Sequence, residues 1–117
     1  MENYILFILQ HFSKAIWKRV AGNKMTLFYS KNIKLTILVR MAIGLPYVPL
    51  DRINEGLEIL KQEAQNVTGP ASVKKFAVRF VKYIEKTWIN GNYEPSTWNY
   101  YLRRGVNTNN YAEGNFI

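Results

Sequence analysis

The segment from Ser72 to about Ile89 has a two-faced pattern that constrains the fold more than any other part of the chain. Its apolar residues keep the i, i+3, i+4 spacing of one helix face: Val73, Phe76, Ala77, Phe80, Val81, Ile84 and Trp88. Four basic residues follow one another at intervals of four, three and four: Lys75, Arg79, Lys82 and Lys86. In an α-helix these two sets lie on opposite faces. The pattern therefore predicts a helix that buries one face and presents a basic stripe, formed by these four residues, to solvent.

Two earlier segments also favour helices, although each leaves an alternative open. Residues 3–21 are apolar at helical spacing, but Tyr4 to Leu9 fits a buried strand that runs into a helix equally well. Gly22 and Asn23 predict the end of this element. Residues 31–45 alternate like a strand around Ile33 and Leu35, yet they also keep helical spacing. Their length favours a helix that is mostly buried.

Prolines and short polar residues mark the next boundaries. Pro46 and Pro49 end the second helix, and Asp51 is predicted to cap a third helix that runs to about Gln65. Pro95 suits the first turn of a short helix over residues 96–103.

Residues 107–117 have the pattern of a further helix start. Glu113 follows Asn110 by three positions, as in a capping box. Taken together, the segments predict a mainly α fold, in which residues 1–117 form a single domain, a small bundle of about five helices.

The net charge of +8 favours a polyanionic partner, with nucleic acid ahead of a membrane surface. Residues 1–50 contain a single carboxylate, that of Glu2, and seven cations: Lys14, Lys18, Arg19, Lys24, Lys31, Lys34 and Arg40. The basic stripe fits a surface that follows a phosphate backbone. The alternative, for the stripe and for the whole chain, is a solvated face with no particular partner.

Composition excludes several kinds of chemistry for this chain. It has no cysteine, so disulfides and thiolate metal sites are impossible. His11 is the only histidine and has no Ser, Cys or Asp partner nearby in the sequence, which argues against a catalytic triad. The seven glycines are separated from one another, so there is no Gly-rich phosphate loop.

The apolar run from Tyr4 to Leu9 is too short for a membrane span. Its six residues fall far below the roughly 20 that cross a bilayer, and no basic stretch or cleavage site marks a signal peptide. We therefore expect an intracellular, unsecreted protein that has neither a membrane nor a small-molecule cofactor as a partner.

The most aromatic part of the chain lies between residues 88 and 104. It contains five large rings: Trp88, Tyr93, Trp98, Tyr100 and Tyr101. Beside Arg103 and Arg104, such rings can stack on nucleobases. More often a cluster of this kind closes a helical core, and that is the expectation here.

Three stretches together resemble the Mutator-like (MULE) DNA transposases of animals. Residues 11–20, HFSKAIWKRV, are similar to the His-Phe-x-x-Ala-x-Trp-Arg segment of that family. Residues 34–50, which end in LPYVPL, are similar to its helical insert, in which an apolar run precedes a proline-containing turn. The most specific stretch is residues 83–100, YIEKTWINGNYEPSTWNY, followed by TNNYAEGN from residue 108.

The resemblance implies an RNase H-like enzyme in which two aspartates and a glutamate hold two divalent ions, Mg or Mn. These ions activate a water or a DNA 3′-hydroxyl for in-line displacement. Glu113 matches the family's glutamate, at the start of the helix over residues 107–117, and residues 31–104 match the helical insertion. The two aspartates would precede Met1. Ile8 stands where the family often has a cysteine three residues before the histidine, His11 here.

Three functional hypotheses follow. The first is a truncated or domesticated transposase fragment, located in the nucleus, that binds DNA through the basic stripe with Arg103 and Arg104. Such a fragment would be catalytically inactive alone, because one carboxylate cannot position two metal ions. The second is a non-catalytic, basic nucleic-acid-binding module. The third is a structural helical protein that pairs with itself, or with the missing catalytic core, through exposed aromatic side chains.

Overall fold

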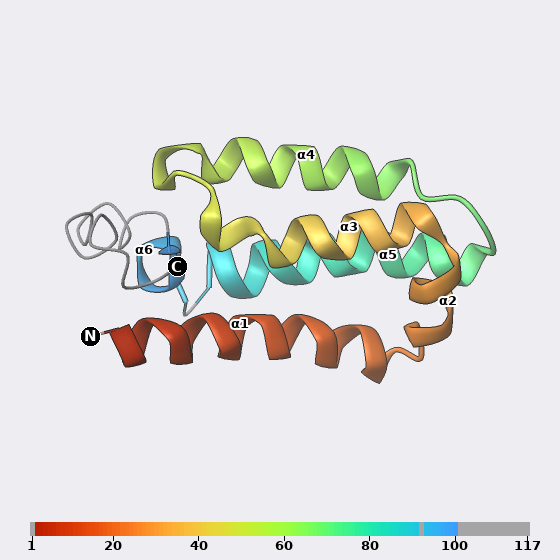
Figure 1. Ribbon diagram of the computed structural model, residues 1–117. Helices are drawn as coiled ribbons and strands as arrows, with labels where there is room; N and C mark the ends of the chain where they lie inside the picture. The colour runs from red at the N-terminus through yellow and green to blue at the C-terminus, as the bar shows by residue number, and fades with distance from the viewer. Residues whose placement is uncertain (1, 92, 101–117) are drawn as a thin grey trace.

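The computed structural model describes residues 2–91 and 93–100, and this part of the chain is helical and contains no strand (Figure 1). Its elements in chain order are α1 (Glu2–Gly22), α2 (Thr26–Lys31), α3 (Ile33–Ile43), η1 (Leu45–Tyr47), η2 (Leu50–Arg52), α4 (Ile53–Gln65), α5 (Ala71–Ile84), η3 (Glu85–Ile89) and α6 (Pro95–Trp98). The predicted mainly α fold, a small helical bundle, is confirmed.

Four longer helices run side by side (Figure 1). Helices α3 and α5 lie between α1 and α4, and α3 contacts all three of the others. The short α2 joins α1 to α3 at one end of the bundle, whereas α6 packs against α1 at the other end.

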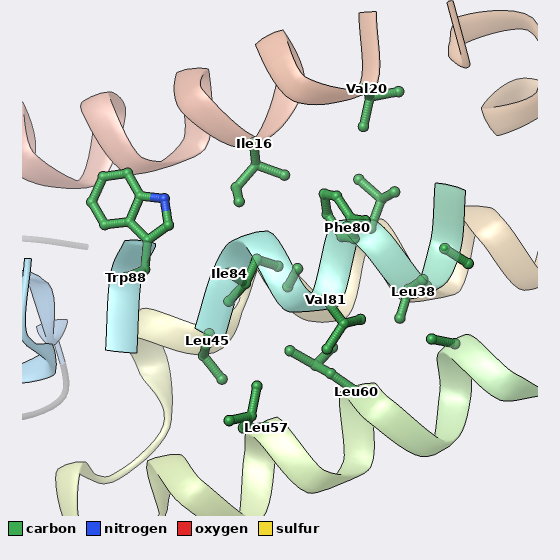
Figure 2. Close-up of a cluster of buried hydrophobic side chains, with 14 of the residues drawn as sticks. Ile16, Val20, Leu38, Leu45, Leu57, Leu60, Phe80, Val81, Ile84 and Trp88 are labelled. Atoms are coloured by element: carbon green, nitrogen blue, oxygen red, sulfur yellow. The ribbon is translucent and has the colours of Figure 1, made fainter. Parts of the chain in front are cut away.

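The core is built from the apolar stripes of these four helices. Figure 2 shows Ile16 of α1 and Leu57 of α4 pointing toward the side chains of α5 from opposite sides. Every apolar residue predicted for the buried face of residues 72–89 is buried: Val73, Phe76, Ala77, Phe80, Val81, Ile84 and Trp88. Burial of this face against three neighbours is what holds α5 in the centre of the bundle.

Aromatic side chains close the end of the bundle at which α6 lies. Phe12 of α1 packs edge-on against Trp88, with ring centroids 4.8 Å apart, and stacks on Trp98 at 5.1 Å. The Trp98 indole Nε1–H donates to the backbone oxygens of Trp88 and Tyr93, at 2.8 and 2.7 Å. The prediction that this cluster closes a core is confirmed for Trp88 and Trp98, and their burial removes both rings from base stacking.

A π-helical turn, η3, links α5 to this aromatic end. The backbone N–H of Asn90 donates to the oxygen of Glu85, five residues earlier, at 2.8 Å. The wider turn carries both Trp88 and Ile89 into the core.

One alternative that the sequence left open is resolved, and one expectation is wrong. Tyr4 to Leu9 is part of α1 and not a strand, because the apolar spacing continues through Phe12 and Ile16 as a single helix. Asp51 does not cap α4. It lies within the 3₁₀ turn η2, so the position before α4 is taken by Arg52, whose side chain makes no capping bond.

Two asparagines for which the sequence predicts no role hold the connections between helices. The side chain of Asn32 accepts a hydrogen bond from the Leu35 N–H at 3.1 Å, which caps α3, and its Nδ2 donates to the Thr68 oxygen at 2.7 Å. Asn99 is fully buried, and its Nδ2 donates to the Val48 oxygen at 2.8 Å. The bond from Asn32 to Thr68 and the bond from Asn99 to Val48 each join segments that are far apart in the sequence.

Several predicted features lie outside the described residues. These are Tyr101, Arg103, Arg104, Glu113 and the helix start over residues 107–117. Within the described part, none of the helices has the length and apolar character needed to cross a membrane.

Candidate nucleic-acid interface

The four basic residues of α5 and its continuation η3 form the predicted stripe on the outside of the bundle. Lys75, Arg79, Lys82 and Lys86 are all exposed, because the opposite face of the same helix is buried in the core. Eleven residues separate the first from the last, which corresponds to about 16 Å along a helix. Among the described residues the ion pairs involve Arg52 and Lys61, and none includes a cation of the stripe. The stripe is therefore an exposed row of positive charges that has no ion-pair partner within residues 2–91 and 93–100.

The α4 side of the stripe carries a charge cluster that is already balanced. Lys61 Nζ lies 3.3 Å from Glu85 Oε2 and 3.4 Å from Glu58 Oε2. The hydrogen bond that Lys61 donates to the Glu85 carboxylate raises the pKa of Lys61 above its usual value. Glu85 is the only carboxylate of the chain between residues 71 and 93, and Lys61 offsets its charge. Repulsion of a polyanion by this carboxylate is correspondingly reduced.

A shallow cleft of about 230 Å³ runs between α4 and α5 beside this cluster. Lys82 of the stripe lines it together with Lys61 and Glu85, and Val78 and Val81 form part of its floor. The cleft is smaller than the pockets that usually hold a drug-sized ligand. We therefore treat the cleft as the edge of the basic surface and not as a binding site for a small molecule.

The α1 side of the stripe is extended by Arg19. Its guanidinium carbon lies 4.3 Å from the centroid of the Tyr83 ring. Tyr83 follows Arg79 by four residues and precedes Lys86 by three, so it lies beside the stripe on α5. The Tyr83 hydroxyl accepts a hydrogen bond from the Trp88 indole at 3.0 Å, which fixes the ring under the guanidinium. The basic surface thus draws on two helices.

Sequence reasoning missed this role of Arg19. The sequence indicates only a cation near the end of a helix, where it complements the helix dipole. Because 64 positions separate it from Tyr83, the pairing depends on how α1 packs on α5 and has no local signal.

The other predicted site residues are not brought to this surface. His11 is exposed on α1, and Asp51 lies in η2 beside α4. Within residues 2–91 and 93–100, no three His, Cys, Asp or Glu side chains lie close enough to hold a metal ion. Glu113, Arg103 and Arg104 lie outside these ranges.

Comparisons with known proteins give no match: no family model, no curated protein and no solved structure is significantly similar to this chain.

Proposed function

We propose that this chain binds nucleic acid, DNA in the first place, through contacts with the phosphate backbone made by the basic stripe. The observation that carries the proposal is the row of four exposed cations on α5 and η3, none of which is in an ion pair among the described residues. A row of about 16 Å is long enough to reach several successive phosphates. Lysine and arginine side chains bind phosphate oxygens in any base sequence, so this surface favours backbone binding without base readout.

The binding mechanism is electrostatic. Each phosphate that a stripe cation neutralises releases condensed counterions, so affinity falls as salt concentration rises. For duplex DNA the slope of log K against log salt is about −0.9 for each phosphate contact. Four stripe contacts therefore predict a slope of about −3.6, and a contact from Arg19 makes it steeper.

The test is the affinity of the full chain for a duplex of about 20 base pairs, measured by fluorescence anisotropy over a range of salt concentrations. Replacing Lys75 and Arg79 with Gln is expected to make the slope shallower by about 1.8. The matched control replaces Lys14 and Lys31, two exposed cations away from the stripe, and is expected to leave the slope nearly unchanged. Equal effects of the two double variants would reduce the stripe to a solvated face.

The transposase resemblance gives a narrower second proposal. In it the chain derives from the helical insertion of such an enzyme, acts in the nucleus and retains DNA binding without catalysis. The sequence stretches that support it are residues 11–20, 34–50 and 83–100.

Strand nicking by the purified chain with Mg²⁺ or Mn²⁺ tests this second proposal, and we expect no cleavage. Reproducible cleavage that disappears in Glu113→Ala would overturn the assignment of a non-catalytic role. Binding of duplex DNA is measured separately, so the first proposal can stand when this second one fails.

A further inference from the structure

Three isoleucines of α3 and α4 are exposed to solvent. Ile33 is 67% exposed and Ile37 is 39% exposed, one turn apart on α3, and Ile59 of α4 is 49% exposed. Exposed large apolar side chains that gather on one surface mark interaction sites more often than those that lie singly. The question is whether these three share a surface.

On α4, Ile59 lies on the side that borders α3. A Cβ atom at Gly56 would stand 3.1 Å from Cδ1 of Leu45, the first residue of η1, two positions after α3 ends, so Gly56 marks that side. Ile59 follows Gly56 by three residues and Glu63 follows it by seven, and both spacings keep to one side of a helix. Ile59 and Glu63 therefore line the border between α4 and α3.

On α3, Ile37 lies on the matching side. Thr36 and Arg40 turn toward the other neighbour: the Thr36 hydroxyl donates to the backbone oxygen of Tyr29 in α2, and Arg40 Nε donates to the Tyr29 hydroxyl at 3.2 Å. Ile33 and Ile37 thus lie between the side of α3 that contacts α2 and the side that contacts α4. They are on the outer edge of the border between α3 and α4. We call the surface formed by Ile33, Lys34, Ile37, Ile59 and Glu63 the α3–α4 face.

The two halves of the α3–α4 face carry opposite charges. On α3 the face carries the cation Lys34, and the chain has no carboxylate between residues 3 and 50. On α4 the face carries the carboxylate of Glu63, whereas Glu58 and Lys61 pair on the side of α4 toward Glu85, and Glu55 pairs with Arg52. A surface of this kind is complementary to a second copy of itself turned by 180°.

We propose that two copies of this chain associate through the α3–α4 face, with α3 of each copy against α4 of the other. In one chain the two helices are antiparallel, and Asn32 lies level with Thr68 while Leu45 lies level with Gly56. Rotation about a two-fold axis parallel to the helices leaves the position of each residue along the helix axis unchanged, so residues that are opposite within one chain are also opposite across the dimer. It places Lys34 of one copy within about one helical turn of Glu63 of the other, and brings the isoleucines of both copies together.

This association is independent of the proposed nucleic-acid binding. Figure 1 shows α5 behind α3. The stripe cations are exposed on the face of α5 opposite its buried residues. The α3–α4 face therefore leaves both stripes of a dimer open. Since α3 and α4 have only 11 and 13 residues, the interface is small, and we expect a weak, transient association.

The experiment is sedimentation equilibrium of the full chain from about 5 to 500 µM, a range chosen to span that weak affinity. We expect a monomer–dimer equilibrium that Ile37→Asp weakens at least about tenfold. Leu27→Asp is the matched control, because Leu27 is 61% exposed on α2 and lies off the face. A monomer throughout this range, or equal effects of the two variants, would overturn the proposal.

A charge exchange tests the orientation of the two copies. Lys34→Glu and Glu63→Lys are each expected to weaken association by several-fold, and the double variant is expected to restore it. Because both side chains reach solvent, neither change removes a core contact. Failure of the double variant to recover, with its circular dichroism unchanged, would exclude the pairing of α3 with α4 of the second copy.

Discussion

Phe12 of α1 stacks on Trp98 of α6, with ring centroids 5.1 Å apart and ring planes inclined by 23°. The same phenyl ring meets Trp88 edge-on at 4.8 Å, so one side chain joins the first helix to the last two described elements. Each of the three rings is at most 4% exposed. The aromatic end of the bundle therefore depends on Phe12.

Replacing Phe12 with Ala should remove both ring contacts and leave a cavity. We expect the free energy of unfolding to fall by about 3–5 kcal/mol, as for other buried Phe to Ala changes. Urea unfolding followed by tryptophan fluorescence measures this loss. Leu27→Ala, at a position 61% exposed, is the control and should change the free energy by less than about 0.5 kcal/mol. Equal losses in the two variants would contradict the role given to Phe12.

The sequence predicted the helices whose two faces differ clearly. The buried and exposed faces of residues 72–89 follow from spacing alone, since a 3.6-residue period separates the apolar set from Lys75 and Lys82. The element α2 was missed because Thr26–Lys31 spans six residues, too few to show that period. Asp51 was misplaced because its residue type favours a cap, whereas the preceding prolines produce a 3₁₀ turn.

The candidate site was predictable only in part, for a similar reason. The basic stripe belongs to one helix and can be read along the chain. The contact of Arg19 with Tyr83 and that of Lys61 with Glu85 join different helices, so each depends on packing that no local pattern encodes. The charge contrast between α3 and α4 is visible in the sequence, but their shared outer face is not.

Gly91 should tolerate no side chain. A Cβ atom there would lie 2.3 Å from the backbone oxygen of Lys86 and 2.8 Å from that of Thr87, both at the turn that ends η3. These atoms cannot move aside like the end of a flexible side chain, so Gly91→Ala is expected to cost about 1–3 kcal/mol. Gly22→Ala is the control, since nothing lies within 4 Å of that Cβ. Thermal unfolding of both variants measures this loss of stability. A Gly91→Ala protein as stable as the Gly22→Ala control would refute the predicted clash.

The contact between Lys61 and Glu85 should make stability depend on alkaline pH. Glu85 raises the pKa of Lys61 in the folded protein, so the charged form is favoured by folding. The stabilisation is fully present below the unfolded pKa, about 10.4, and is lost as pH rises through the folded pKa. We therefore expect Glu85→Gln to lower the melting temperature at pH 8 and to lose this effect toward pH 12. A difference that stays constant with pH would assign the effect to packing instead.

Arg19 should contribute to both stability and binding of nucleic acid. Loss of its contact with the Tyr83 ring in Arg19→Gln is expected to cost about 0.5–1 kcal/mol, as for exposed cation–π pairs. If the guanidinium also reaches a phosphate beside Arg79, the slope of log K against log salt should become shallower by about 0.9. Lys18→Gln is the control, because this neighbouring cation is exposed and in no ion pair among the described residues. A change in stability with an unchanged slope would restrict Arg19 to holding α1 on α5, and the basic surface would then end at the stripe.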